Sequence, residues 1–140
     1  MRNLLMSGFF MLIVCSLNAQ IGIAVAKTNE SVVEWSVSWG KGSSLDCKMD
    51  ARQKLIDKGY KNVSTLDGDD CCGHTIKSGY YVVVEGVAES DGESYIQEYG
   101  LGASSISYSE AEARAVKNLS VYANHWKPND GYKTNKRGTF

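Results

Sequence analysis

The sequence has little of what a catalytic or metal-dependent protein needs. Its 140 residues include two histidines, His74 and His125, and one proline, Pro128. It contains no Gly-x-Ser-x-Gly nucleophile elbow, no glycine-rich phosphate-binding loop and no His-Glu-x-x-His metal motif. We therefore expect no catalytic residues, no metal ion and no cofactor, and we expect that the protein is not an enzyme.

The sequence also lacks an excess of charge of either sign. The formal net charge is −1, and a chain so nearly balanced is not typical of a general polyanion binder. Four basic side chains do gather near the end of the sequence, at Lys127, Lys133, Lys136 and Arg137. We interpret residues 127–140 as a polar, basic C-terminal tail and expect no nucleic-acid partner.

The sequence has no apolar run as long as a typical transmembrane helix, but it has a shorter apolar run near its start. Arg2 is followed by an apolar stretch over residues 4–15, which is shorter than the roughly 20 residues that a transmembrane helix needs. A basic start, a short apolar run and a small residue at Ala19 are typical of a secretory signal peptide. We prefer cleavage after Ala19 to the alternative after Ala26, because Ile21, Ile23 and Val25 alternate with small residues as a first strand would. The mature protein would then be periplasmic or secreted, with no stable membrane span.

Three cysteines would remain after cleavage: Cys47, Cys71 and Cys72. Export would place them in an oxidising compartment, where disulfides persist. We expect one disulfide from Cys47 to either Cys71 or Cys72, with the third thiol left over. A thiol site made by Cys71, Cys72 and His74 is the alternative, although residues this close in sequence seldom point usefully at one another.

Hydrophobic periodicity predicts alternating strands and helices. In residues 31–39, Trp35, Val37 and Trp39 share one strand face. A helix should start at Ser43 or Ser44 and end at Gly59, with Leu45, Met49 and Ile56 on its apolar stripe and Ala51 and Leu55 close beside it. The other predicted elements are a loop over 60–78, strands over 79–88 and 95–101, and a helix whose start is marked by the capping boxes Ser107-x-x-Glu110 and Ser109-x-x-Glu112.

The two halves of the sequence resemble each other. Each predicts a strand that ends in glycines, serines that cap a helix, and an acidic-Ala-Arg triplet, Asp50–Arg52 in one half and Glu112–Arg114 in the other. We predict a single α+β domain over residues 20–126. Its fold would be a duplicated ββα-ββα unit, forming an antiparallel sheet with two helices on one face.

Aromatic residues concentrated on the predicted strands suggest how such a domain would act. Tyr81, Tyr95 and Tyr99 are hard to bury completely beneath two short helices, and exposed tyrosines often anchor protein interfaces. We predict a binding surface through these three residues, with another protein as partner.

The chain resembles small periplasmic proteins that neutralise an enzyme, such as lysozyme inhibitors and toxin-immunity proteins. The resemblance lies in the predicted architecture, the predicted export and the predicted disulfide from Cys47. The resemblance implies an inhibitor or immunity-type function. A thiol-dependent or hydrolytic enzyme using residues 71–74, and an envelope structural protein, are the alternatives.

Overall fold

A computed structural model describes residues 20–66, 76, 78–90 and 94–140. The elements in these ranges are β1 (Gln20–Thr28), β2 (Ser31–Lys41), α1 (Ser44–Asp57), β3 (Val63–Thr65), β4 (Tyr80–Ser90), β5 (Ser94–Ser104), α2 (Tyr108–Tyr122), the 3-10 turn η1 (Pro128–Asp130) and β6 (Tyr132–Thr139). All the strand pairings are antiparallel. The predicted α+β class is therefore confirmed.

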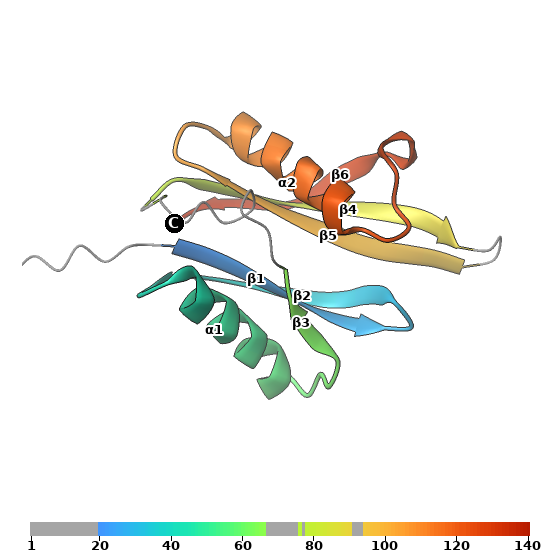
Figure 1. The fold of residues 1–140 in the computed structure, drawn as a ribbon, viewed down its shortest axis with the longest axis horizontal. Helices are drawn as coiled ribbons and strands as arrows, with labels where there is room; N and C mark the ends of the chain where they lie inside the picture. Colours follow the sequence, from blue (N-terminus) through green and yellow to red (C-terminus); the bar gives the residue numbers. More distant parts are fainter. Residues whose placement is uncertain (1–19, 67–75, 77, 91–93) are drawn as a thin grey trace, which may run out of the picture.

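The described strands form two sheets, each with a helix on its outer face (Figure 1). Sheet A has the order β2-β1-β3 and packs against α1, whereas sheet B has the order β5-β4-β6 and packs against α2. The inner faces of the two sheets meet in a shared core, which contains Ile21 and Ile23 from sheet A and Val83 and Leu101 from sheet B. The layers are thus helix, sheet, sheet and helix.

The sequence analysis predicted both helices on one face of a single sheet, and this prediction is wrong. Each helix instead covers a different sheet. The reason lies in strands such as β4, where Tyr81 and Val83 enter the core between the sheets while Val82 and Val84 pack beneath α2. A strand that is apolar on both sides needs a cover on both faces. Sheet A covers the inner face of β4, and α2 covers its outer face.

The predicted duplication is compatible with this architecture. Each predicted ββα unit is followed by one further strand, so that the observed units are ββαβ. In both units the first two strands form a hairpin, a helix follows, and a further strand pairs with the first strand. The helices correspond through their N-caps, Ser43 and Ser107, and through buried residues at equal distances from those caps: Cys47, Ala51 and Leu55 in α1, and Ala111, Ala115 and Leu119 in α2. The acidic-Ala-Arg triplets lie at different distances from the caps, so they are not the equivalent positions.

The buried face of α1 differs from the predicted stripe. Leu45 and Met49 are exposed, and the helix instead buries Cys47 and Ala51 with Leu55. Small side chains suit this face because α1 lies very close to β1. A Cβ atom added at Gly22 would lie 2.5 Å from the backbone nitrogen of Lys48.

Two strands were not predicted from the sequence. The three-residue strand β3 lies in the expected loop, and it is too short to show periodicity. The second, β6, accounts for most of the expected C-terminal tail, because Tyr132–Thr139 pairs with β4 along sheet B. Its side chains are almost all exposed, so its sequence carries no apolar alternation.

An ion-paired aspartate attaches α1 to the edge of sheet A. Asp50 accepts a hydrogen bond from the Ser38 hydroxyl and pairs with Lys54 at 2.9 Å and Lys41 at 3.4 Å. The hydrogen bond from Ser38, followed by the one from Lys54, lowers the pKa of Asp50 from 3.8 to about 2. Ionised Asp50 therefore stabilises the folded state.

This shift predicts a specific acid sensitivity. Because the pKa of Asp50 is lower in the folded state than in the unfolded state, its contribution is complete above about pH 4 and is lost as the pH falls toward 2. Between these limits the wild type should lose about 1 kcal/mol more unfolding free energy than Asp50→Asn, allowing for partial solvent screening. Urea unfolding at a series of pH values measures this difference. Parallel pH profiles for the two proteins would contradict the assignment.

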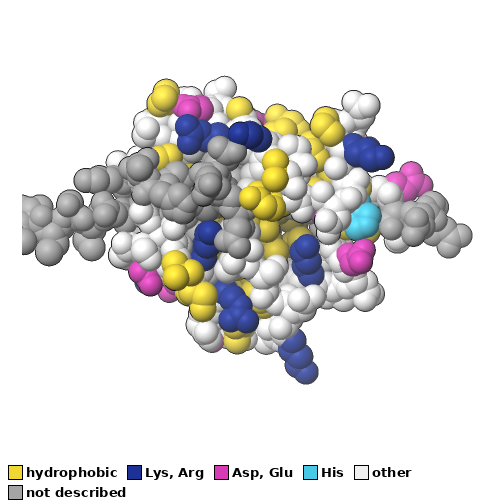
Figure 2. Space-filling model, viewed as in Figure 1, with side chains coloured by type: hydrophobic (Ala, Val, Ile, Leu, Met, Phe, Trp, Pro, Cys, Tyr) yellow, Lys and Arg dark blue, Asp and Glu magenta, His cyan; other side chains and the backbone are white. Residues whose placement is uncertain are grey.

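On the face shown in Figure 2, apolar side chains lie scattered among polar and basic ones. None of the helices within the described ranges is long and apolar enough to cross a membrane.

Candidate binding surface at the open end of sheet B

A buried carboxylate organises the inner face of sheet B. Glu85 on β4 is 3% exposed and accepts hydrogen bonds from the Tyr99 hydroxyl at 3.1 Å and the Asn135 side-chain amide at 2.8 Å. The Gln97 side-chain amide lies 3.5 Å from the carboxylate, and the Lys133 ammonium pairs with it at 3.0 Å. A buried charge needs such partners, and these come from both strands that flank β4. Glu85 thereby ties β5 and β6 to the middle strand.

The hydroxyl of Tyr99 is held in its neutral, hydrogen-donating form. Burial raises the pKa of Tyr99, and the adjacent negative charge of Glu85 raises this pKa further. The ring also packs near Trp35 of β2, with 6.4 Å between the ring centroids. Tyr99 therefore serves as a fixed link between the two sheets.

The structure separates the three tyrosines of the predicted binding surface. Tyr81 is only 3% exposed and packs against Trp39, with ring centroids 5.6 Å apart. Tyr99 is half-buried, whereas Tyr95 is 75% exposed. Both Tyr81 and Tyr99 thus lie in the layer between the sheets, and Tyr95 is the member of the predicted set that is free to contact a partner.

Tyr95 is the second residue of β5. The β4–β5 hairpin extends past the β1–β2 turn of sheet A (Figure 1). We call this region the open end of sheet B and define it by the inner-face residues Val87, Glu89, Tyr95 and Gln97. The strand register places Glu89 opposite Tyr95 and Val87 opposite Gln97. Val87 is 39% exposed. A hollow of about 280 Å³ adjoins Val87 and is also lined by Glu85, Asp130, Tyr132 and Lys133.

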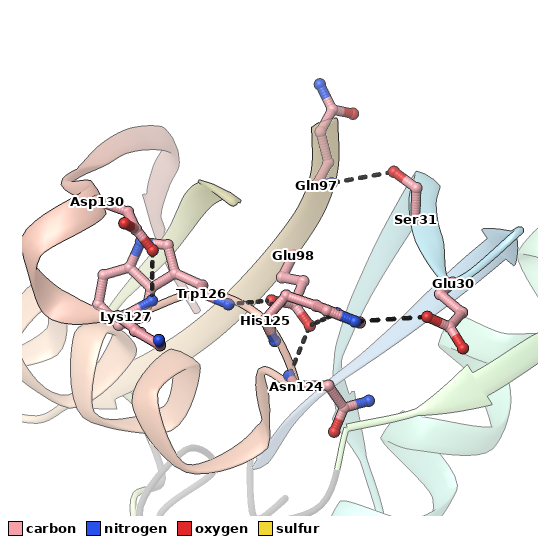
Figure 3. Close-up of polar contacts among 9 residues, drawn as sticks. All are labelled: Glu30, Ser31, Gln97, Glu98, Asn124, His125, Trp126, Lys127 and Asp130. Atoms are coloured by element: carbon pink, nitrogen blue, oxygen red, sulfur yellow. Dashed lines mark hydrogen bonds and ion pairs between the residues drawn. The ribbon is translucent and has the colours of Figure 1, made fainter. Parts of the chain in front are cut away.

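A second buried carboxylate fixes the opposite face of β5 (Figure 3). Glu98 is 4% exposed and accepts hydrogen bonds from three consecutive backbone N–H groups: Asn124 at 2.7 Å, His125 at 3.2 Å and Trp126 at 2.8 Å. These residues follow α2, where the chain leaves helical geometry and its N–H groups need new acceptors. Glu98 therefore sets the path of the chain beyond α2.

Trp126 positions the segment between α2 and β6. Its indole N–H donates to the Gly131 carbonyl at 2.6 Å, and its ring lies against β4 at Gly86, where an added Cβ would be 2.5 Å from the ring. Gly131 has a φ of +75°, a conformation that glycine adopts without strain. Glu98, Trp126 and Gly131 together determine where β6 begins.

The two ββαβ units meet beside the open end. His125 of the second unit lies between two carboxylates, with Nε2 3.5 Å from Glu30 and Nδ1 3.8 Å from Glu98 (Figure 3). The Ser31 hydroxyl accepts a hydrogen bond from the backbone N–H of Gln97 at 3.0 Å. These contacts join the β1–β2 turn to β5 and support the strand that carries Tyr95.

Of the three cysteines in the predictions, the structure describes Cys47. Cys47 is a free, buried cysteine whose thiol donates to the Gln20 carbonyl at 2.9 Å, and burial raises the pKa of this thiol. Cys71, Cys72 and His74 lie outside the described residues. The disulfide and the alternative thiol site therefore stay predictions. Within the described ranges, no three His, Cys, Asp or Glu side chains form a group that could hold a metal ion.

Sequence reasoning missed both organising carboxylates. Glu85 and Glu98 each stand inside a strand and are buried there, although acidic residues are almost never fully buried without partners. Glu85 interrupts the apolar run from Val82 to Ala88. A charged residue within such a run was the sequence signal that could have indicated a buried, partnered carboxylate. The identities of its partners depend on strand register, which the sequence alone did not supply.

The fold and site define a small α+β protein made of two ββαβ units with an exposed end on one sheet. No protein family, curated protein or solved structure matches the chain.

Proposed function

We propose that this protein is a small exported binding module that contacts a protein partner through the open end of sheet B. The observation that carries the proposal is the exposure of Tyr95 at 75% on a strand that is fixed on both faces. A large aromatic side chain offered to solvent from rigid backbone supplies contact area at low entropic cost.

The support beneath Tyr95 favours binding over a purely structural role. Glu85 and Glu98 fix β5 from opposite faces, and the contact between Ser31 and Gln97 fixes its edge. A rigid surface loses little conformational freedom when a complex forms. Val87 adds exposed apolar area next to Tyr95, and Glu89 and Gln97 provide a polar margin. An apolar centre with a polar rim is the usual composition of a protein interface.

The resemblance to periplasmic inhibitors and immunity proteins suggests that the partner is an enzyme and that binding neutralises it. In this proposal the residues of the open end act by contact alone, without chemistry of their own. The envelope outside the cytoplasm is the proposed location, following signal-peptide cleavage after Ala19 and formation of a disulfide from Cys47, whose thiol would give up its hydrogen bond to the Gln20 carbonyl. Intact-mass analysis of the protein from its native host tests both steps, because cleavage removes residues 1–19 and each disulfide removes two hydrogens.

Replacing Tyr95 by alanine should weaken partner binding without unfolding the protein. The partner is first captured from the native envelope and identified by mass spectrometry, and calorimetry then compares the variants. Loss of an exposed aromatic anchor should cost about 1–3 kcal/mol, or roughly 5- to 150-fold in Kd. Tyr122→Ala is the matched control, because Tyr122 is also exposed but lies on α2. Equal Kd values for wild type and Tyr95→Ala, with weaker binding by Tyr122→Ala, would contradict the proposal.

A further inference from the structure

The outer edge of β6 is a second feature that can bind. In sheet B, β6 pairs with β4 along one edge, and among the described residues no strand pairs with its other edge. Six of the first seven side chains of β6 are exposed, and the strand contains no proline. An exposed edge presents a row of backbone donors and acceptors that an additional strand can pair with.

The hydrogen-bond pattern identifies which backbone groups face outward. Gly79 and Phe140 exchange both of their backbone hydrogen bonds, at 3.0 and 3.1 Å. In an antiparallel pair, hydrogen-bonded residue pairs alternate with pairs whose N–H and C=O groups point away. The register pairs Tyr80 with Thr139 and Val82 with Arg137. Arg137 and Thr139 therefore direct their N–H and C=O groups toward the open edge.

The charge on this edge is positive and incompletely neutralised. Lys133, Lys136 and Arg137 lie on β6, and the sequence has no acidic residue after Asp130. Lys133 is paired with the buried Glu85. Lys136 instead lies 5.7 Å from the centre of the Trp35 ring, and Arg137 lies 5.6 Å from that of Tyr108. These ring contacts orient the two cations but leave their charge available to an anion.

A hollow flanks the same edge on its outer side. It has a volume of about 360 Å³ and lies between α2 and β6, because α2 packs on β4 and on Gly100 and Gly102 of β5. Arg137 and Tyr108 line it together with Glu112, whose carboxylate accepts a hydrogen bond from Thr134 at 2.9 Å. Alternate side chains of an added strand would enter this hollow, which is how strand addition acquires specificity.

We propose that the edge of β6 accepts an extended, acidic segment of a protein partner as an additional strand, paired through Arg137 and Thr139. Acidic side chains on the two faces of that segment would pair with Lys136 on the inner face of sheet B and with Arg137 on its outer face. A second copy of this chain is disfavoured as the occupant, because pairing two β6 edges would bring their cations together. This surface is separate from Tyr95, so the inference stands or falls independently of the proposed function.

The test uses a blocked peptide with a Glu-Glu-Val-Val repeat, which presents glutamates on both faces of an added strand. The corresponding lysine–valine peptide of equal length is the control. NMR spectra of the full protein should show shifts centred on β6 with the acidic peptide, together with slowed exchange of the Arg137 and Thr139 amides. N-methylation of the acidic peptide on alternate residues removes the donors that strand pairing needs and should abolish binding. The double substitution Lys136→Gln and Arg137→Gln should weaken binding by roughly tenfold. Tyr95→Ala should bind the peptide as the wild type does.

Each of several results would overturn the inference. These are equal binding of the lysine–valine peptide, undiminished binding of the N-methylated peptide, and amide shifts that avoid β6. Dimerisation of the protein through β6 in sedimentation experiments would assign the edge to a second copy instead. Tighter binding of a single-stranded oligonucleotide than of the peptide would assign the cations to a nucleic acid.

Discussion

Replacing Glu98 by alanine is expected to lower the free energy of unfolding by about 3–5 kcal/mol. The carboxylate accepts three backbone N–H groups in a buried position, and the substitution leaves those donors without an acceptor. An unsatisfied buried donor costs about 1–3 kcal/mol, and partial relaxation toward solvent reduces the sum. Urea denaturation followed by tryptophan fluorescence measures the effect, and Trp126 lies within the affected segment.

The controls for this experiment come from the same sheet. Glu89→Ala removes an exposed acid from β4 and should change stability by less than about 0.5 kcal/mol. Glu98→Gln should fall between the wild type and Glu98→Ala, because a neutral amide has one oxygen acceptor in place of two. If Glu98→Ala were no less stable than Glu89→Ala, Glu98 would not organise the segment after α2.

Substituting alanine for Gly102 should have the second large effect, a loss of about 3 kcal/mol. A Cβ atom at this position of β5 would lie 2.0 Å from the Ala111 carbonyl oxygen and 2.3 Å from the Ala115 backbone nitrogen. Both are backbone atoms of α2, so the whole helix must move, and overpacking of this kind costs about 1–3 kcal/mol or more. Thermal unfolding measures the loss.

The matched substitution is Gly42→Ala. Its added Cβ would meet only the Asp46 side chain, at an ordinary contact distance of 3.4 Å. We expect its stability to stay within about 0.5 kcal/mol of the wild type. Equal stabilities for the two alanine variants would show that α2 does not pack as closely on β5 as described.

Local signals in the sequence were sufficient for most elements. Ser107 caps α2 by accepting a hydrogen bond from the Glu110 N–H at 3.1 Å, as the Ser107-x-x-Glu110 pattern predicts, whereas Ser109 lies inside the helix. Trp35, Val37 and Trp39 do share a face of β2, since they pair with the core-facing residues of β1. Such features depend on neighbouring residues, and a sequence displays them directly.

Features that depend on packing between elements were not predictable in the same way. The choice of Cys47 and Ala51 as the buried face of α1 follows from the close approach of the helix to Gly22. The division of the strands into two sheets follows from the need to cover both faces of β4. The strand β6 owes its place to backbone pairing and to Glu85, neither of which produces apolar periodicity.

Of the three tyrosines that the sequence analysis selected, Tyr95 is the one that is exposed at the candidate site. Tyr95 is placed where a partner can reach it, whereas the alternation that identified Tyr81 and Tyr99 could not distinguish solvent from a second sheet. Strand periodicity assigns residues to a face, but it does not say what covers that face. The carboxylates that hold the surface rigid required the strand register.

The central claim is that a protein partner binds the open end of sheet B, and hydrogen–deuterium exchange of the complex tests it most directly. Once the captured partner is purified, exchange is measured on the free and bound protein. We predict slower exchange in the arms of the β4–β5 hairpin, residues 85–90 and 94–99, with little change in α1. Slower exchange confined to α1 and β3, with the hairpin unchanged, would contradict the account.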